Sequence, residues 1–395
     1  MAAWAAFVSA TLFFLFEFVT RISPSLAPGP ISAWFGLSAA GFSTLSSLFF
    51  WVYAPMQIVV GLALDRYGAR RLVLPAILAC AGGMALFALT ADPVIGGAGR
   101  MLTGLGASFA FVGALYVVNH RFPPGRFALL SGVVNAVGML GTAIGATALS
   151  LAVEAQGWRP VFLAIAAAGL ALFVLAALVL RDGPDAPRPA PEPHPLARLK
   201  PLMRDRQVWL IALVGALYYM PVNVYGGLWG KAELIADRGL GDGMAELVAS
   251  MIFWGMAVGS IGAGVISDSI GRRREVLIAG AALSGTAYAA ALFLPGLGAA
   301  TLGLLLFLAG MFNGGQMLTF AMAKEGHPTA FAGTIIAFVN MIGIGGALVF
   351  QPLVGALLDA SGGYGLPMLT IPGTVLAAAL LAMTLTERRH PDHAA

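Results

Sequence analysis

Charged residues are scarce in this chain. Only 10% of its 395 residues are Asp, Glu, Lys or Arg, whereas 59% are hydrophobic, and the mean hydropathy is +0.88. A water-soluble domain carries about 25% charged residues because its surface has to stay solvated. Apolar runs of about 20 residues, long enough to cross roughly 30 Å of hydrocarbon, recur along the whole sequence. The composition therefore predicts a polytopic membrane protein.

Residues that form disulfides and metal sites are also rare. Cys80 is the single cysteine and lies within an apolar run, which excludes an intramolecular disulfide and a cysteine-rich metal site. The five histidines are scattered through loops and the tail, without the H-x₃-H spacing of a metal site. No G-x-x-x-x-G-K-[ST] loop for ATP and no Ser-His-Asp set occurs. We therefore expect no metal, no cofactor and no enzymatic activity.

Apolar segments separated by breaks predict twelve transmembrane helices. A segment rich in Pro and charge, 182–206, separates the sixth from the seventh and predicts an extended cytoplasmic linker. The expected fold is an all-α membrane protein with an N-terminal six-helix bundle over 1–181 and a C-terminal six-helix bundle over 207–395. The twelve expected spans are 4–26, 38–64, 72–91, 94–119, 127–152, 159–181, 207–229, 245–267, 275–295, 298–323, 330–358 and 364–386.

Basic residues lie mainly in the short loops between these spans. The pI of 9.4 is compatible with nucleic-acid binding, but this placement instead fits the excess of Lys and Arg in cytoplasmic loops. With both termini and the linker in the cytoplasm, the outer loops hold only Arg159, Lys231 and Arg238 of the 22 Lys and Arg residues. We expect a multi-pass protein of the inner (plasma) membrane with cytoplasmic termini and no nucleic-acid partner.

Two sequence echoes relate the halves. The segments "GLALDRYGARR" (61–71) and "GVISDSIGRRR" (264–274) both read G-x-x-x-D-x-x-G before a basic cluster, and both close the second span of their half. The segments "VVNAVGMLG" (133–141) and "FVNMIGIGG" (338–346) match at one Asn and two Gly positions, at a nearly equal offset. The second half is therefore predicted to repeat the first in the same orientation.

With these features the chain resembles the major facilitator superfamily over nearly its whole length. The two G-x-x-x-D-x-x-G loops resemble the family's loop signatures, and "GRMLTGLGASFAF" (99–111) resembles its fourth-span signature. The resemblance implies alternating access by two halves, usually in a monomer, and a conformational latch at the two loops. Orientation of membrane insertion is the alternative role of these loops. The expected latch residues are Gly61, Asp65, Gly68, Arg70, Arg71, Asp268, Arg272 and Arg273.

Glu17 and Arg21 are ionisable residues inside the first span. A charge at such a position is costly unless it faces a cavity or a partner. At 1.5 Å per residue, Glu17 lies roughly 10 Å below the outer end of its span, and Arg100 lies at a similar depth in the fourth. Spans one and four line the cavity in the resembled family. We therefore expect Glu17 to meet Arg100, with Arg21 about one turn higher. A static Glu17–Arg100 or Glu17–Arg21 pair between helices is the alternative.

The resemblance also implies roles for these residues. Arg21 resembles the first-span arginine with which the family's organic anion:proton symporters hold a substrate carboxylate, although Thr20 replaces the Asp that usually precedes it. Glu17 and Arg100 would couple protons. Polar residues in spans seven, ten and eleven need hydrogen-bond partners, which a wet cavity or a neighbouring helix can supply. The further expected substrate contacts are Tyr218, Tyr219, Asn223, Asn313, Gln316 and Asn340.

We therefore predict a secondary active transporter that takes up a small organic anion or a zwitterionic nutrient together with protons. A proton-driven exporter of an amphipathic compound is the alternative. The fifth span argues against it, because Gly141 is followed by Thr142 and not by the proline usual in the family's exporters. A non-transporting sensor or assembly partner is the third possibility, but such a protein should have lost the charges in its spans or gained a soluble domain.

Overall fold

The structure is a computed structural model, and its description covers residues 2–37, 39–180, 199–325, 327 and 332–387. In these residues the regular structure is helical, and twelve helical segments are long and apolar enough to span a membrane. The predicted all-α membrane fold with twelve spans is therefore confirmed. The helices fall into two compact units, each of which is described separately below.

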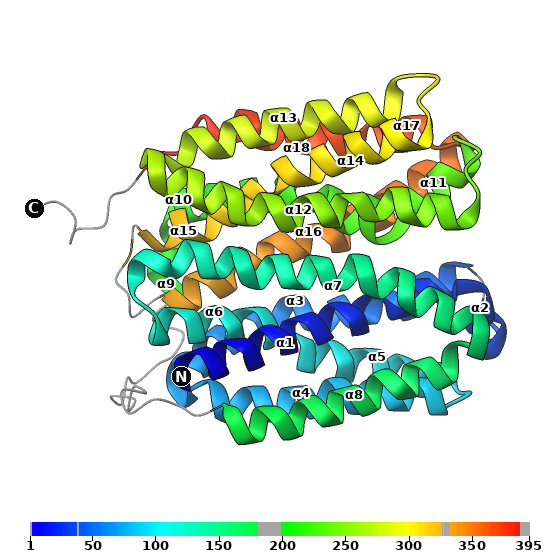
Figure 1. Cartoon of the computed structure of the whole chain (residues 1–395), viewed down its shortest axis with the longest axis horizontal. Coiled ribbons are helices and arrows are strands. Elements are labelled where there is room, and N and C mark those ends of the chain that lie inside the picture. The colour runs from blue at the N-terminus through cyan, green and yellow to red at the C-terminus, as the bar shows by residue number, and fades with distance from the viewer. Residues whose placement is uncertain (1, 38, 181–198, 326, 328–331, 388–395) are drawn as a thin grey trace, which may run out of the picture. The chain divides into compact units, whose positions relative to one another are not determined.

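The first unit contains the helices up to residue 124 and the part of the chain from Ile144 to the end of α8. Within it, α4 packs against α5 and α8, and α3 packs against α5 (Figure 1). Its elements are α1 (Ala2–Ile22), η1 (Ser23–Leu26), α2 (Pro28–Phe35), α3 (Ala39–Tyr67), α4 (Ala69–Leu89), α5 (Pro93–Ala107), α6 (Ala110–Arg121), the end of α7 (Phe127–Gln156) and α8 (Trp158–Val179).

The second unit contains Gly125–Ala143, which includes η2 (Pro124–Arg126) in part and the first half of α7, and the helices from α9 onward. Within it, α12 packs against α14, α13 against α18, and α10 against α16. Its later elements are α9 (Leu199–Arg204), α10 (Arg206–Pro221), η4 (Val222–Trp229), α11 (Gly230–Ala236), α12 (Asp242–Ile270), α13 (Arg273–Phe293), α14 (Ala299–Asn313), η5 (Gly314–Met317), α15 (Leu318–Glu325), α16 (Ala332–Ser361), α17 (Gly365–Met368) and α18 (Thr370–Ala382).

The predicted linker lies mostly outside the described residues. Its described end is not extended as expected, because Leu199–Arg204 forms the short helix α9. This stretch is rich in Leu, Lys, Met and Arg, which favour helix, and Leu202 is buried. Asp205 then caps α10, since its Oδ1 accepts a hydrogen bond from the Gln207 N–H at 2.8 Å.

The two echoed loops have the same backbone turn. Gly68, between α3 and α4, has φ +77°, and Gly271, between α12 and α13, has φ +69°. An L-residue with a side chain adopts this left-handed region only at an energetic cost, so both loops require glycine here. The sequence echo therefore corresponds to a repeated structural element.

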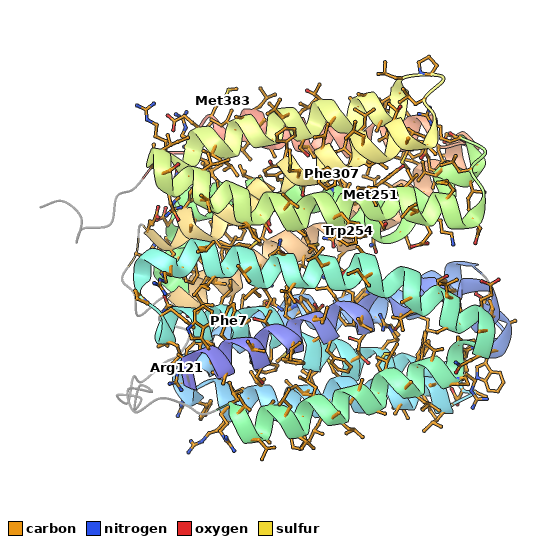
Figure 2. All side chains as sticks on the ribbon, viewed as in Figure 1. Phe7, Arg121, Met251, Trp254, Phe307 and Met383 are labelled. Carbon is orange, nitrogen blue, oxygen red and sulfur yellow. The ribbon has the colours of Figure 1, made fainter. Side chains whose placement is uncertain are left out.

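Small residues allow close helix packing in both units. A Cβ atom added to Gly104 of α5 would collide with the Phe49 carbonyl of α3. In the second unit, a Cβ atom on Gly255 of α12 would collide with the Phe307 carbonyl of α14, and one on Gly259 with the Met311 carbonyl. Phe307 is labelled in Figure 2. In each unit the second span therefore packs closely on the fourth, as expected where small residues bring transmembrane helices together.

Non-α segments interrupt the first, fourth, seventh and tenth spans. The first continues from α1 into the 3₁₀ turn η1, and the fourth breaks between α5 and α6. The seventh contains the π-helix η4, and the tenth contains the 3₁₀ turn η5. Interrupted helices expose backbone groups that regular helices satisfy internally, and π-helical segments are frequent at functional sites. Most of the predicted substrate-binding and proton-coupling residues lie on these four spans.

Candidate functional site

Glu17 and Arg21 form a buried ion pair one turn apart on α1. Arg21 Nε lies 3.6 Å from Glu17 Oε1, and the two side chains are 8% and 0% exposed. Neither carboxylate oxygen of Glu17 accepts a hydrogen bond within the described part of the chain. The Arg21 guanidinium also lies over the Phe18 ring, with Cζ 3.8 Å from the ring centroid. The negative charge of Glu17 is thus balanced by Arg21 without the donors that a buried carboxylate usually has.

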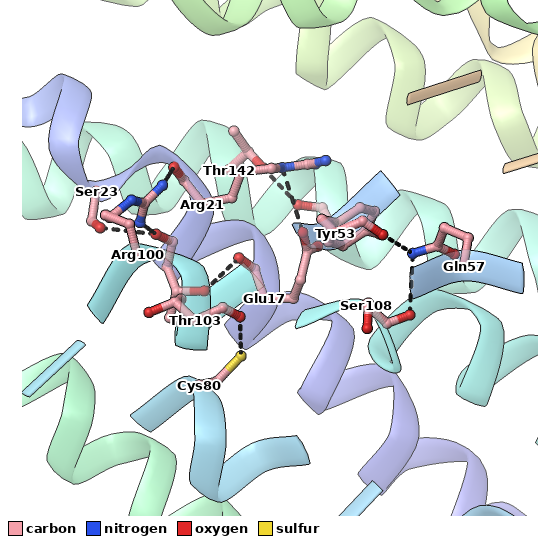
Figure 3. Close-up of polar contacts among 12 residues, drawn as sticks. Glu17, Arg21, Ser23, Tyr53, Gln57, Cys80, Arg100, Thr103, Ser108 and Thr142 are labelled. Carbon is pink, nitrogen blue, oxygen red and sulfur yellow. Dashed lines mark hydrogen bonds and ion pairs between the residues drawn. The ribbon is translucent and has the colours of Figure 1, made fainter. Parts of the chain in front are cut away.

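Arg100, on α5, binds the carboxyl end of α1 (Figure 3). Its Nη1 donates to the Thr20 carbonyl at 2.9 Å, and its Nη2 donates to the Arg21 carbonyl at 3.2 Å. These carbonyls belong to the last turn of α1, where the helix itself supplies few donors. A cation is also favoured at this negative end of the helix dipole. Arg100 therefore fixes the end of α1 beside the ion pair.

The contact predicted between Glu17 and Arg100 is not present. No ion pair joins these two residues in the described structure, where Glu17 pairs with Arg21. The estimate of depth placed the two residues at one level but could not say which way each side chain points. The last turn of α1 lies nearer to Arg100 and presents its carbonyls.

Neighbouring hydroxyl and thiol groups are directed to backbone carbonyls. Thr20 Oγ1 donates to the Glu17 carbonyl at 2.8 Å, and Ser23 Oγ donates to the Thr20 carbonyl at 3.0 Å. Cys80 Sγ lies 3.3 Å from the Thr103 carbonyl (Figure 3). These groups are therefore engaged elsewhere and do not solvate the Glu17 carboxylate.

Tyr218 and Asn313 connect α10 to α14 in the second unit. The Tyr218 hydroxyl donates to the Phe312 carbonyl, and Asn313 Nδ2 donates to the Tyr218 carbonyl at 2.6 Å. Both residues are fully buried. Asn313 Oδ1 has no hydrogen-bond partner within the described residues. The structure thus brings these two predicted site residues together in a contact between helices.

The other predicted contacts of the second unit are buried on interrupted or neighbouring spans. Asn223 lies in the π-helix η4, where its carbonyl accepts a hydrogen bond from Gln351 Nε2 at 2.9 Å. Its Nδ2 has no acceptor among the described groups. The remaining three lie on α10, η5 and α16 and are also buried: Tyr219, Gln316 and Asn340.

A second buried acid, Glu233, was not predicted. Its Oε2 accepts a hydrogen bond from the Tyr225 hydroxyl at 2.8 Å, and its Oε1 lies 3.5 Å from Arg238 Nε. Arg238 also donates to the carbonyls of Ala291, Leu292 and Leu294 around the end of α13. The sequence placed Glu233 outside the membrane because its span was expected to end at residue 229. The apolar residues that follow, such as Leu234, could have indicated a longer span.

The predicted latch residues occupy the two echoed loops. In the second unit, Arg273 Nη1 donates to Asp268 Oδ1 at 2.8 Å, and Arg273 Nε lies 2.5 Å from Glu325 Oε1. Glu325 was missed because the tenth span was expected to end two residues earlier. Arg272 is exposed and lies 4.0 Å from Glu275.

In the first unit, Gly61 lies on α3, and Arg70 Nη1 donates to the Leu180 carbonyl at 2.5 Å. Gly68 forms the turn described above, and Arg71 is exposed. The side chain of Asp65 lies outside the described part of the structure.

Comparison with known proteins identifies the family. A family model of the Major Facilitator Superfamily matches residues 3–232 and 211–395. This chain belongs to the major facilitator superfamily. The family predicted from the spans and loop signatures is therefore confirmed. Its members are transporters, and the relatives described below are also named as transporters.

Curated relatives and a solved structure cover almost the whole chain. A "Probable sulfoacetate transporter" of Cupriavidus necator is 25% identical over 94% of this chain and 90% of its own length. A "Gentisate transporter" of Corynebacterium glutamicum is 26% identical over 90% of this chain and 81% of its own length. The crystal structure of the fucose:proton symporter of E. coli is 16% identical, with a TM-score of 0.73 over 97% of this chain and 99% of that chain. This structural likeness supports the major facilitator fold.

Proposed function

We propose that this transporter takes up a small organic anion or zwitterionic nutrient together with protons, across the inner (plasma) membrane. The buried Glu17–Arg21 pair carries the proposal, because the two carboxylate oxygens of Glu17 accept no hydrogen bond in the described structure. Relatives named for the transport of sulfoacetate and gentisate, both organic anions, support the substrate class.

The ion pair suggests how protons and substrate are coupled. When Glu17 binds a proton, its charge disappears and its electrostatic hold on Arg21 is lost. Arg21 can then bind the anionic group of the substrate, for which a guanidinium is well suited. When Glu17 is ionised, it competes with the substrate for the same cation. Proton binding and anion binding therefore favour each other, and by linkage the effect is reciprocal.

Arg100 acts in this scheme as a positioning residue for proton coupling. Its two hydrogen bonds hold the carbonyls of Thr20 and Arg21, the second of which belongs to the residue that binds the substrate. Because Arg21 and Glu17 both lie on α1, Arg100 holds the last turn of this helix, and with it the backbone of Arg21, in place relative to α5. Six polar residues of the second unit are the further substrate contacts in this proposal: Tyr218, Tyr219, Asn223, Asn313, Gln316 and Asn340.

In alternating access, the loaded site is then closed to one side of the membrane and opened to the other. The two loops with their glycine turns and charged side chains act as the latch of one state, and the protein works as a monomer with both termini in the cytoplasm. In the second loop, Arg273 joins Asp268 to Glu325, which ties the end of α12 to the end of α15. The two ion pairs of Arg273 can break and re-form together.

Uptake by purified protein in liposomes tests the proposal. Labelled carboxylates, sugars, amino acids and nucleosides are supplied with and without an inward proton gradient. We expect accumulation of an anion that requires the gradient and is lost in Arg21→Ala. Proton release on addition of a hydrophobic cation, without uptake of any anion, would instead indicate an exporter.

A further inference from the structure

Within the described spans of the first unit, the charged groups far from a span end are one carboxylate, Glu17, and two guanidinium groups, Arg21 and Arg100. Glu17 and Arg21 balance each other at 3.6 Å. Arg100 is instead placed against the carbonyls of α1, through both of its terminal nitrogens. The carboxyl end of a helix carries roughly half a negative charge, which offsets much of the Arg100 charge. The Glu17–Arg21 pair is therefore the part of the site in which a formal charge is matched by a formal charge.

Basic residues of the second unit are already matched to acids or lie at span ends. Lys231, near the end of the seventh span, lies 3.1 Å from Asp242 Oδ2 and 3.4 Å from Glu246 Oε2. Arg238 is paired with Glu233. The other basic residues of the described spans in this unit, Arg206, Arg273, Arg274 and Lys324, lie within two residues of a span end. A second negative charge on a substrate would thus lack a dedicated cation.

On the basis of the proposed function, we propose that the substrate is a monovalent anion and that one proton enters with it, so that the cycle moves no net charge. The proton neutralises Glu17 while the substrate anion takes its place beside Arg21. The loaded site then has the same net charge as the empty site. This equality matters because both forms cross the hydrocarbon region, where an unbalanced charge is strongly disfavoured.

The surroundings of Arg21 indicate the body to which the anionic group is attached. The Phe18 ring lies under the guanidinium, and the Phe14 ring packs edge-on against Phe18 at 4.9 Å between centroids. On α3, Phe49 and Tyr53 are stacked at 5.4 Å, and Phe49 lies under Arg100. These buried rings surround the charged groups with apolar surface, which favours contact with apolar groups and offers few hydrogen bonds to a polyhydroxylated chain. A monocarboxylate with an aromatic or apolar body is the ligand that fits this chemistry.

Transport by the full chain in liposomes tests the charge balance. Labelled benzoate and 4-hydroxybenzoate are compared with phthalate and terephthalate, which carry a second carboxylate on the same ring. A pH gradient and a potassium diffusion potential are imposed separately, and protein-free liposomes correct for passive entry. For a cycle that moves one net charge, the accumulation ratio changes tenfold for each 59 mV or so of potential.

We expect monocarboxylate uptake that rises with the inward proton gradient and changes less than twofold with a tenfold potassium gradient. We also expect dicarboxylate uptake at least tenfold slower. Uptake that requires Arg21 and the proton gradient, but follows the membrane potential or favours dicarboxylates, would overturn the charge balance and leave the proposed function intact. No uptake of either class, equally in wild type and Arg21→Ala, would overturn the inference on the charge and body of the substrate. The same failure over the wider panel of carboxylates, sugars, amino acids and nucleosides would overturn the proposed function as well.

Discussion

Each unit contains a buried acid with an arginine, but the two acids are held differently. Glu233 accepts a hydrogen bond from Tyr225 and lies beside Arg238, which is itself bound to carbonyls around the end of α13. Glu17 has Arg21 at a similar distance, yet neither of its oxygens accepts a hydrogen bond among the described residues. Glu233 is thus fixed by a hydrogen-bonded network, whereas Glu17 is held by one electrostatic contact.

This difference indicates that the Glu233–Arg238 ion pair is structural, whereas the Glu17–Arg21 ion pair can break and re-form. A buried network with its hydrogen bonds satisfied makes its surroundings rigid, and breaking it is costly. When a buried carboxylate that accepts no hydrogen bonds binds a proton, no hydrogen bond is broken and only the ion pair is lost. We therefore assign Glu233 to the stability of the α11–α13 end of the second unit and Glu17 to the transport cycle. The substitutions below test this division.

Replacing the arginine of each pair should affect different properties, transport in one case and stability in the other. These are the largest effects that we expect. Arg21→Ala should lower gradient-driven uptake at least 100-fold, or about 2.7 kcal/mol, because the substrate anion loses its cation. Arg238→Ala should instead destabilise the fold by about 3 kcal/mol, because Glu233 stays buried without its cation. Uptake per folded molecule and the thermal midpoint in detergent measure the two effects. Equal loss of uptake in both variants, after correction for folded protein, would remove the distinction.

Replacing the acids should separate proton coupling from stability. Wild-type uptake should rise as the outside pH falls, because Glu17 has to bind a proton before the anion binds to Arg21. Glu17→Gln keeps the shape and removes the charge, so we expect uptake independent of outside pH and a loss of about 30-fold in gradient-driven accumulation. Exchange of labelled for unlabelled substrate across the membrane should persist.

The matched control for this variant is Glu233→Gln. It should keep the pH dependence of uptake and lower the thermal midpoint, since Arg238 then lacks its anion. If Glu17→Gln still accumulated substrate with the wild-type pH profile, Glu17 would belong with Glu233 as a structural residue.

The membrane fold could be predicted from the sequence because its main signal is local. A span needs a continuous apolar run of fixed length, and each of the twelve runs is visible without knowledge of its neighbours. The glycine turns at Gly68 and Gly271 were visible for the same reason, because the repeated loop pattern marks them directly. Span ends were less certain, so Glu233 and Glu325 were placed outside the helices that contain them.

The partners of side chains could not be predicted in the same way. Residue counting gave the depth of Glu17 and Arg100, but not the rotation of α1 or the position of its last turn. Arg100 therefore meets the Thr20 carbonyl, a backbone group that no sequence pattern marks as an acceptor. The sequence left open whether Asn313 lies at a wet cavity or joins two helices. Its bond to Tyr218, between α14 and α10, depends on packing that only the folded structure defines.

Arg100→Lys should have an intermediate effect. Lys keeps the charge near the end of α1, but its single ammonium cannot reproduce the planar fork that reaches both the Thr20 and Arg21 carbonyls. We expect uptake to fall about tenfold, mainly through a higher KM, because the backbone of Arg21 is held less firmly. Arg100→Ala should be worse than Arg100→Lys, and measurement of KM and kcat for both variants checks this order. Equal activity of the Lys variant and wild type would show that charge alone is needed.

Tyr225→Phe should have the smallest effect, and it tests the structural side of the comparison. The change removes the hydroxyl that donates to Glu233 Oε2 and leaves the ring in its buried position. One hydrogen bond to a charged group contributes about 1.5–3 kcal/mol, so the thermal midpoint should fall by a few degrees. Uptake at saturating substrate and its pH dependence should stay within twofold of wild type. A changed pH profile in this variant would mean that Glu233 also exchanges protons during transport, and the two acids would then form a pair of coupled sites.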